Sequence, residues 1–379
     1  MRDDRTRVLI AGGGVAGIET LLAVQALAAE RVSLELLTPD RHFTHRSLAV
    51  TEPFGPERPQ RIPLAAIAAD RGVVLHRDAV ASVDTDARMV ETQDRARVAY
   101  DVLVLALGAR PVEAVPGTLT FRGTQDAHRV REIVGALRAG SIRRVAFVAP
   151  ADTGWTLPMY ELALQAAHAV PSADLHLVTA EPEPLAAFGP DASAATAHLL
   201  AERGITMHAS TAAEEHADGQ LRFASGASLA ADRAIALPHL TGPHLRGIPS
   251  DPAGFVPVDE FTSVLDVAAV HAVGDIAAHG LKQGGLAAQQ ADVAAQVIAA
   301  AAGADVVPRP YRPVLRGMLI CGDEVRYLRH EPSGGSEVSD ELLWWPPHKV
   351  AGRHLAHYLA SHAELALPAV RGAEPTTVT

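Results

Sequence analysis

The chain opens with a short apolar run, a glycine turn and a longer apolar segment. Residues 7–11 read Arg-Val-Leu-Ile-Ala, residues 15–29 are rich in Ala, Leu and Val, and residues 32–37 form another apolar run. Short apolar runs on either side of a helix-length segment are typical of parallel strands joined by a helix. The pattern therefore predicts a βαβ unit, with helices covering the faces of a parallel sheet.

The rest of the chain repeats this alternation. Short β-like stretches at 73–76, 79–84 and 87–92 predict a small antiparallel insertion, and the apolar run at 102–106 predicts a buried strand. The further elements that we expect are helices at about 126–139, 157–169, 191–203 and 285–302, strands at 143–149, 174–179, 233–237, 268–273 and near 314–330, and a final helix from Pro346-Pro347 to about 365.

We therefore predict an α/β fold with two Rossmann-like units, the first interrupted by the second, and a C-terminal α+β region. The expected parts are 1–116 and 235–307 for the first nucleotide-binding domain, 117–234 for the second, 308–367 for an interface region and 368–379 for a disordered tail.

Composition narrows the possible functions. The formal net charge of the 379 residues is −11, with no basic cluster, which argues against nucleic acid as a partner. No apolar run approaches the roughly 20 residues of a membrane span. Cys321 is the only cysteine, which rules out an internal disulfide and a thiolate metal cluster. The N-terminal apolar stretch is too short for a signal peptide, so we expect a cytoplasmic location.

The first turn has the spacing of a phosphate-binding loop. Gly12, Gly14 and Gly17 follow a predicted strand and open a predicted helix. The first glycine permits a tight turn, the second lets the backbone approach a pyrophosphate, and the third lets the helix pack on the sheet. The helix N-terminus at Val15 and Ala16 then presents free N–H groups to phosphates.

The position that usually binds the adenosine ribose departs from the common pattern. An acidic residue normally ends the second strand of such a unit. Here Glu35 lies inside the strand, Thr38 falls near the expected position and Asp40 follows just beyond. Whether Thr38 or Asp40 contacts the ribose stays open.

A second motif distinguishes proteins that bind a flavin dinucleotide from those that bind a nicotinamide dinucleotide. Val270-His271-Ala272-Val273 predicts a strand that delivers Gly274 and Asp275 at its end. Glycine removes the Cβ at a point where backbone and ligand meet. A helix that includes Gly285 follows close behind.

With these motifs the chain resembles the flavoproteins that have two dinucleotide-binding domains, the pyridine nucleotide-disulfide oxidoreductase superfamily. It is most similar to the sulfide:quinone oxidoreductase and type II NADH dehydrogenase branch, over about residues 5–305. The motifs, in family order, are Ala11-Gly12-Gly13-Gly14-Val15-Ala16-Gly17-Ile18-Glu19, Tyr100-Asp101-Val102-Leu103-Val104-Leu105-Ala106-Leu107-Gly108-Ala109-Arg110-Pro111 and Val273-Gly274-Asp275.

The resemblance implies FAD as the cofactor and assigns roles by position. Asp275 would bind the ribityl chain, and the helix after Lys282 would point its N-terminus at the pyrimidine end of the flavin. The other positions that the resemblance places at the cofactor are Ala79 and Val80 at the adenine, Ala106, Gly108 and Arg110 near the pyrophosphate, Arg46 in a loop beside the flavin or adenosine, and Gly285 in the flavin-facing helix.

The second unit lacks a second glycine motif. Its strand–helix junction, residues 149–161, contains one glycine, Gly154, and carries Trp155 and Pro158. Trp155 would fill space that a pyrophosphate needs, so the sequence predicts a degenerate NAD(P)H site.

The cysteine chemistry of the sulfide:quinone branch is also incomplete. The resemblance places Trp155 near the position of one family cysteine and Cys321 near the other. A lone thiol could form a flavin adduct or a persulfide but cannot close a disulfide. The alternative, which we favour, is that Cys321 is a buried small hydrophobe. We therefore do not expect sulfide oxidation by the family mechanism.

Lys282 is the candidate catalytic residue, because a cation there would favour reduced, anionic flavin. The alternative is an ordinary surface lysine. Trp344-Trp345 suggests core packing or a subunit contact in a homodimer, ahead of a weak contact with a membrane surface. The His354 and His357 spacing supports no metal site.

Three functions remain in view. The first is an FAD-dependent oxidoreductase that passes electrons between a small donor and a quinone-like or other acceptor without a redox-active disulfide. The second is an NAD(P)H-dependent flavin reductase or dehydrogenase. The third is a flavin-binding protein that has lost redox catalysis.

Overall fold

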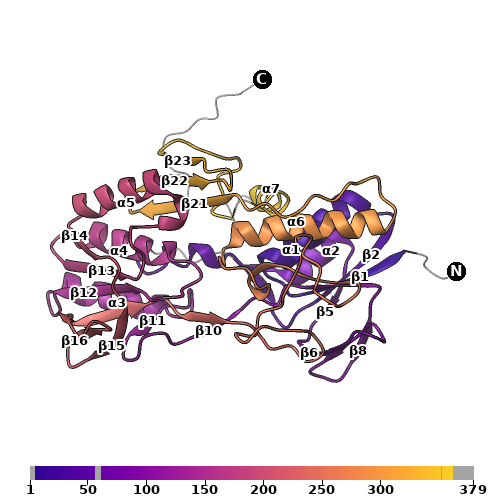
Figure 1. Ribbon diagram of the computed structural model, residues 1–379, viewed down its shortest axis with the longest axis horizontal. Helices are drawn as coiled ribbons and strands as arrows, with labels where there is room; N and C mark the ends of the chain where they lie inside the picture. The colour runs from indigo at the N-terminus through magenta and orange to yellow at the C-terminus, as the bar shows by residue number, and fades with distance from the viewer. Residues whose placement is uncertain (1–4, 56–60, 351, 362–379) are drawn as a thin grey trace.

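The computed structural model describes residues 5–55, 61–350 and 352–361. Two lobes lie side by side, each built around a five-stranded sheet, and a C-terminal antiparallel sheet lies above α4 and α5 of the second lobe and reaches toward α6 (Figure 1). The lobes correspond to the two α/β units that the sequence predicts.

All strands of the first sheet run parallel, in the order β20-β9-β1-β2-β5. These strands are β1 (Thr6–Ala11), β2 (Val32–Leu37), β5 (Val74–His76), β9 (Val102–Leu105) and β20 (Val270–Ala272). β20 follows the second lobe in sequence, so the first sheet combines strands from before and after that lobe.

The second sheet repeats this arrangement in the order β11-β18-β12-β13-β14, again all parallel. Its strands are β11 (Leu119–Thr120), β12 (Arg144–Ala149), β13 (Asp174–Thr179), β14 (Ile205–His208) and β18 (Arg233–Ala236). We expected a domain boundary between residues 234 and 235. β18 runs across this position, and all of it pairs with β12 in the second sheet.

Helices cover the sheets, and the lobes share a small two-stranded link. In the first lobe α1 (Val15–Ala28) packs along α6 (Gly284–Ala301), and in the second α4 (Leu157–Ala169) lies between the sheet and β21. The link pairs β10 (Arg110–Val112) with β19 (His239–Thr241). Further helices are α2 (Leu64–Arg71), α3 (Ala127–Arg138), α5 (Pro190–Glu202) and α7 (Leu355–Ala360), with 3-10 turns η1 (Arg46–Leu48), η2 (Ala186–Phe188) and η3 (Gly274–Ile276).

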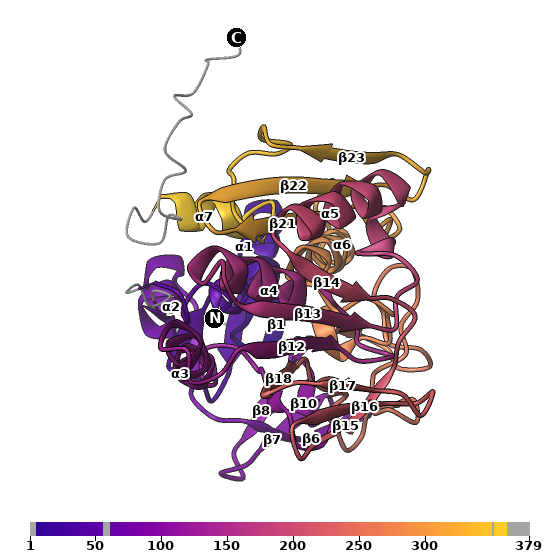
Figure 2. The ribbon, with the colours of Figure 1, turned by 90° about the vertical axis from the view of Figure 1, so that its left-hand side faces the viewer.

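Antiparallel strands occupy the edges and the C-terminal region, as Figure 2 shows for β6–β8, β15–β17 and β21–β23. Their bounds are β3 (His42–Thr44), β4 (Arg61–Pro63), β6 (Val80–Asp84), β7 (Met89–Thr92), β8 (Arg97–Ala99), β15 (Ala213–Ala217), β16 (Gln220–Phe223), β17 (Ser228–Ala230), β21 (Leu315–Cys321), β22 (Glu324–His330) and β23 (Ser336–Ser339).

Two expected elements differ from the structure. The stretch at 73–76 is not part of the antiparallel insertion, because β5 pairs in parallel with β2 at the edge of the first sheet. The final helix begins at Leu355, later than the expected start at Pro346-Pro347. Its expected end at 365 and the tail from 368 lie outside the described residues.

A buried ion pair joins the second lobe to the C-terminal region. The Nζ atom of Lys349 lies 2.6 Å from both carboxylate oxygens of Glu161 in α4, and the N–H of Ile320 donates to the same carboxylate over 3.1 Å. The side chains of Glu161 and Lys349 are 0% and 5% exposed. Burial raises the pKa of Glu161, and the Lys349 ammonium opposes that shift. Each charge therefore depends on the other for its stability.

We expect Lys349→Met to lower the free energy of unfolding by about 3–5 kcal/mol, because it leaves a buried carboxylate unpaired. Lys349→Met combined with Glu161→Leu should recover most of that loss. The exposed pair Arg222–Glu215 provides the control, since Arg222→Met should cost less than about 1 kcal/mol. Urea denaturation of the four proteins measures this, and an equal loss in the single and the double variant would contradict it.

Candidate functional site

The first glycine turn is fixed by close backbone contacts. Gly12 has a φ of +123°, and its N–H donates to the Leu37 carbonyl over 2.8 Å. A Cβ at Gly12 would lie 2.1 Å from the Ala106 oxygen, and one at Gly17 would lie 1.9 Å from the Gly12 oxygen. Strands β1 and β9 and helix α1 therefore meet at a distance that only glycine allows at these two positions.

Gly14 is different, because the space around it is open. It is exposed, and no atom lies within 4 Å of the place that a Cβ would take. Gly14 is the N-cap of α1, no side chain caps the helix, and its first turn carries no acidic residue. The N–H groups at Val15 and Ala16 therefore begin a helix whose N-terminus suits an anion such as pyrophosphate.

The second motif lies directly against this turn. Gly274 has a φ of +78°, and a Cβ there would lie 2.9 Å from the Cβ of Ala16. The N–H of Gly274 donates to Oε1 of Gln290 in α6 over 2.7 Å. Two stretches more than 250 residues apart in the chain are thus in contact at the N-terminus of α1.

Two positive charges act on Asp275, the residue that follows Gly274. Burial raises the pKa of Asp275, and the positive charges of Lys282 and Arg46 oppose that shift. Arg46 is exposed in the 3-10 turn η1. The candidate catalytic lysine and a residue that the resemblance assigned to the cofactor therefore both stabilise the charge of Asp275.

Lys282 is not an ordinary surface lysine. It is buried, its Nζ atom lies 3.8 Å from the centre of the Phe255 ring, and it donates to the Ala277 carbonyl. Burial lowers the pKa of Lys282 to about 8, against the opposing charges of Asp275 and Asp251. Its ammonium is therefore easier to deprotonate than that of a solvated lysine.

The N-terminus of α6 follows Lys282 and is closed on one side. Oε1 of Gln283 accepts the N–H of Leu286 over 2.8 Å, while its Nε2 donates to the Arg316 carbonyl over 3.0 Å. A Cβ at Gly285 would lie 2.9 Å from Oε1 of Gln283, so a larger residue here would push against the capping amide.

The residues in and after β2 include the candidates for the ribose contact. The Glu35 carboxylate is paired with the His76 ring on the neighbouring strand β5. Thr38 is buried, and its Oγ1 accepts the N–H of exposed Asp40 over 3.2 Å. Thr38 lies beside the glycine turn, near Gly13, and Asp40 is attached to it by this hydrogen bond. The choice between Thr38 and Asp40 as the ribose contact stays a prediction.

The remaining predicted cofactor residues lie in separate segments: Ala79 and Val80 at the start of β6, and Gly108 and Arg110 between β9 and the link between the lobes. The N–H of Ala79 donates to Asp78 Oδ1 over 2.7 Å, its carbonyl accepts from Gln93 over 2.9 Å, and Val80 pairs with Thr92 of β7. Gly108 has a φ of +72° with open space around it. Arg110 is exposed in β10. Their roles stay predictions.

The second lobe carries an acidic residue that sequence reasoning missed. Glu181 follows the end of β13, where nucleotide-binding units commonly place their ribose-binding carboxylate. Here its Oε2 accepts the hydroxyl of buried Tyr160 over 2.8 Å and that of Thr179 over 3.3 Å. The signal was present in the sequence, since Glu181 follows the second strand of the second unit.

The junction ahead of α4 is filled by aromatic packing. The Trp155 ring lies 5.7 Å from the Phe188 ring, measured between centroids, and packs against the core of the second lobe. Next to it, the N–H of Lys282 donates to the Gly154 carbonyl over 3.0 Å. The junction therefore contacts the Lys282 segment of the first lobe.

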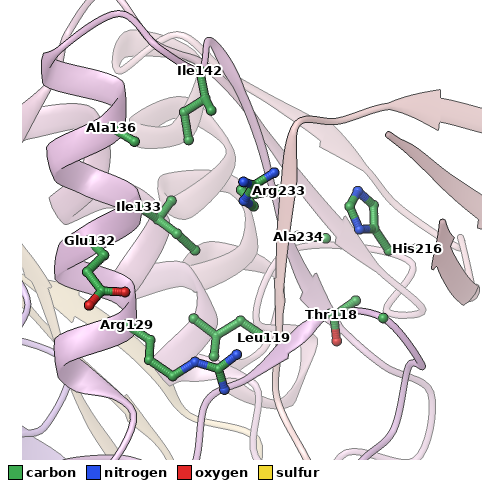
Figure 3. Close-up of a pocket in the computed structure, with 11 residues that line it drawn as sticks. Thr118, Leu119, Arg129, Glu132, Ile133, Ala136, Ile142, His216, Arg233 and Ala234 are labelled. Carbon is green, nitrogen blue, oxygen red and sulfur yellow. The ribbon is translucent and has the colours of Figure 1, made fainter. Parts of the chain in front are cut away.

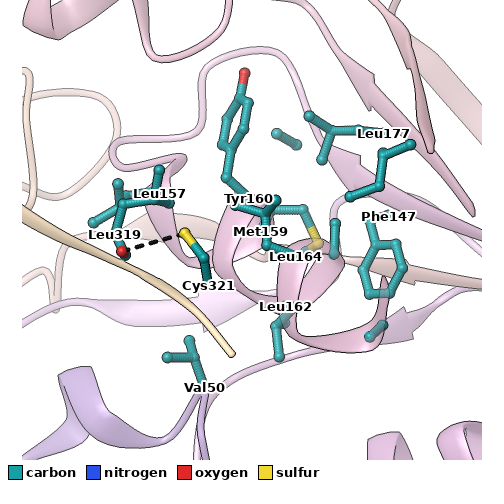
Figure 4. Close-up of a cluster of buried hydrophobic side chains, with 14 of the residues drawn as sticks. Val50, Phe147, Leu157, Met159, Tyr160, Leu162, Leu164, Leu177, Leu319 and Cys321 are labelled. Carbon is teal, nitrogen blue, oxygen red and sulfur yellow. Dashed lines mark hydrogen bonds between the residues drawn. The ribbon is translucent and has the colours of Figure 1, made fainter. Parts of the chain in front are cut away.

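Cys321 lies inside the core of the second lobe, among Leu157, Met159 and Leu319 (Figure 4). Its thiol donates to the Leu319 carbonyl over 3.4 Å. Burial, reinforced by the charge of Glu161, raises the pKa of Cys321 to about 12. A thiol in this state is protonated at neutral pH, as expected of a buried small hydrophobe rather than a nucleophile.

The described residues contain one group with metal-like composition, Glu19, Asp292 and His354, whose ligand atoms lie within 4.8 Å of one another. Glu19 accepts the backbone N–H groups of His354 and Leu355 over 2.7 and 2.6 Å. Its carboxylate thus anchors the start of α7 to α1, and we assign this group no metal.

Comparisons with known proteins identify the family of the chain. Residues 6–296 match the family model of the pyridine nucleotide-disulphide oxidoreductases, so the chain belongs to that family. The protein is therefore an FAD-dependent oxidoreductase with a Rossmann-type nucleotide-binding fold. No helix in the described part of the chain is both long and apolar enough to cross a membrane.

Three similar proteins illustrate the range of the family. An NADH dehydrogenase-like protein of Mycobacterium tuberculosis is 26% identical over 298 residues, which cover 72% of this chain and 73% of that protein. A demethylphylloquinone reductase of Synechocystis is 26% identical over 38% of this chain and 39% of its own length. The sulfide:quinone oxidoreductase of Aquifex aeolicus shares the fold, with a TM-score of 0.81 at 19% identity, over 95% of this chain and 90% of that one.

We expect Gly14→Asp to weaken FAD binding at least 100-fold, because it places a carboxylate in the open space where the pyrophosphate would lie. Gly14→Ala is the matched control and should lose much less, since the Cβ itself meets nothing. Flavin fluorescence titration of the apoprotein measures both affinities, and circular dichroism checks folding. Equal affinities for the two variants would show that the phosphates lie elsewhere.

Proposed function

We propose that this protein transfers electrons between a small donor and a quinone-like acceptor through FAD, without a redox-active disulfide. The observation that carries the proposal is the contact between Gly274 and Ala16, where the two dinucleotide motifs meet. Asp275 follows this contact directly, and the charges of Lys282 and Arg46 act on its carboxylate. The family supplies the flavin, and the printed activity of the cyanobacterial relative supports a quinone-like acceptor.

The absence of a disulfide follows from the residues present. Cys321 is the only cysteine of the chain, and it is buried with a raised pKa. Trp155 occupies the junction where the branch carries its other cysteine, and an indole forms no persulfide. Electrons therefore have no thiol relay, and donor and acceptor must each exchange them directly with the flavin.

We propose the following division of labour among the residues of the flavin site. Gly12, Gly14, Val15, Ala16 and Gly17 hold the pyrophosphate, with Ala106, Gly108 and Arg110 beside it. Thr38 is placed at the ribose, Ala79 and Val80 at the adenine, and Arg46, Gly274, Asp275 and Gly285 along the ribityl chain and flavin.

FAD, when bound, supplies a centre that takes up and releases two electrons. The chain's own residues would control the charge that accompanies this change. Asp275 would orient the ribityl chain, and the Lys282 ammonium, together with the N-terminus of α6, would stabilise negative charge at the pyrimidine end. Because its pKa is about 8, Lys282 provides this charge below that pH and loses it above.

A second candidate function is an NAD(P)H dehydrogenase, favoured by the printed name of the mycobacterial relative. Two contacts in the second lobe weigh against it. The Glu181 carboxylate is already engaged by Tyr160, and Trp155 packs into the junction that would receive the pyrophosphate. We therefore rank it below a donor that needs no second nucleotide site.

We also propose a cytoplasmic homodimer, with the C-terminal region at its contact. Trp344 is engaged inside the chain, where its Nε1 donates to the His348 carbonyl over 3.1 Å. Trp345, by contrast, is 69% exposed, close to exposed Leu342. Such apolar exposure suits a subunit contact or, less favourably, a membrane surface.

The donor can be identified by anaerobic reduction followed at the flavin absorption band near 450 nm. We expect a small quinol to bleach the wild-type band, while NADH and NADPH do so at least 100-fold more slowly. Trp155→Gly should accelerate reduction by NADH, because it opens the junction, whereas the control Trp345→Phe should not. Fast bleaching of the wild type by NADH would favour the second candidate, and no bleaching by any donor would leave a flavin-binding protein without redox activity.

We expect Lys282→Met to lower the midpoint potential of the bound flavin by on the order of tens of millivolts, because a positive charge is lost beside the reduced ring. Lys282 carries its positive charge only when protonated, that is, below its pKa. The difference between wild type and variant should be largest below the Lys282 pKa of about 8 and shrink above it. Spectroelectrochemical titration measures this, with Lys282→Arg as the control that keeps the charge. A constant difference across this pH range would contradict a role for the Lys282 charge.

A further inference from the structure

The second lobe contains a cavity of about 540 Å³ between α3 and strands β11 and β18 (Figure 3). Its walls come from α3, the loop after β10, the start of β18 and the edge of the β15–β16 hairpin. The lining residues are Gly117, Thr118, Leu119, Arg129, Glu132, Ile133, Ala136, Ile142, His216, Arg233 and Ala234. None of them belongs to the proposed flavin site or to the junction at 149–161.

Positive charge predominates at this cavity. Two exposed arginines, Arg129 and Arg233, and one exposed acidic residue, Glu132, line it, in a protein whose net charge is −11. Within the described residues, the Arg129 guanidinium makes no hydrogen bond or ion pair. Arg233 uses its Nη1 to reach the Asp232 carbonyl and keeps further N–H groups for a ligand. Two guanidinium groups with spare donors favour an anionic group.

His216 adds a directional polar group to the same cavity. Its Nε2 lies 2.8 Å from the Ala231 carbonyl, which can only accept, so Nε2 carries a proton and donates it. The position of His216 is fixed, because its N–H donates to Pro116 and a Cβ at Gly117 would lie 2.0 Å from its oxygen. This wall is therefore already formed without a ligand.

The rest of the lining is apolar. Ile133, Ala136 and Ile142 are half-buried, and Leu119 closes the base from the edge strand β11. Figure 3 shows Arg129 and Ile133 projecting from α3 toward the strand that carries Arg233. The volume falls in the range of roughly 300–1,000 Å³ that is usual for small-molecule pockets, whose linings likewise combine apolar side chains with a few polar groups.

We propose that this cavity binds a compact organic anion, with an apolar ring body between Ile133, Ala136 and Ile142 and a carboxylate or phosphate group at Arg129 and Arg233. The apolar lining excludes a bare inorganic anion as the best fit, since such an anion would leave these side chains facing water. The site is separate from the proposed redox function and does not depend on it.

The test uses the FAD-loaded protein and two probes with the same body, 2-naphthoate and 2-naphthyl phosphate, followed by isothermal titration calorimetry. We expect saturable binding of at least one probe with one site per chain, and the tighter of the two identifies the head group. Arg129→Gln and Arg233→Gln should each weaken binding at least tenfold, through loss of a charge-assisted contact. Arg138→Gln, at the exposed end of the same helix, is the control and should leave the affinity unchanged.

A shape variant separates the cavity from simple surface attraction. Ala136→Phe should abolish binding while both arginines remain, because the ring would occupy the apolar space. The flavin spectrum and thermal unfolding of each variant confirm that it is folded. Failure of the wild type to bind either probe at millimolar concentration would overturn the proposal, as would binding that resists Ala136→Phe or falls equally in Arg138→Gln. If inorganic phosphate bound as tightly as the naphthyl probes, the proposal that the cavity recognises an apolar ring would be wrong.

Discussion

The structure depends on backbone contact at glycines where strands and helices meet. The first sheet is completed by β20, which arrives after the whole second lobe, and its end at Gly274 lies against Ala16 in the first turn of α1. A Cβ at Gly12 would meet the backbone of Ala106, just after β9, and a Cβ at Gly17 would meet the backbone of Gly12. A side chain at any of these points would have to displace backbone or a packed methyl group, which the surrounding core does not allow.

This contact also explains where the charges lie. Asp275 follows Gly274 directly, so bringing the two motifs together necessarily places a carboxylate in a partly buried position. Lys282 and Arg46 reduce the cost of that burial, since unpaired charges are strongly disfavoured away from water. Lys349 likewise offsets the cost of burying the Glu161 carboxylate, where the second lobe meets the C-terminal region. Both arrangements connect parts of the chain that are far apart in sequence.

The features that could be predicted from sequence are those with a local pattern. The glycine spacing of residues 12–17, the apolar strands and the helices of both lobes depend on near neighbours, and they lie close to their expected positions. The features that could not be predicted depend on distant partners. β5 belongs to the parallel sheet because β2 was available for pairing, and Lys282 is buried because Phe255 and Ala277 cover it. The engagement of Glu181 by Tyr160 likewise requires the folded second lobe.

The buried thiol of Cys321 has a consequence for the conditions under which such a protein can operate. Alkylating agents and peroxides attack exposed thiolates, and the sole sulfhydryl of this chain is both enclosed and protonated. Enzymes that shuttle electrons through a cysteine pair stop when that pair is modified. A flavoprotein with a single buried cysteine has no such pair to lose.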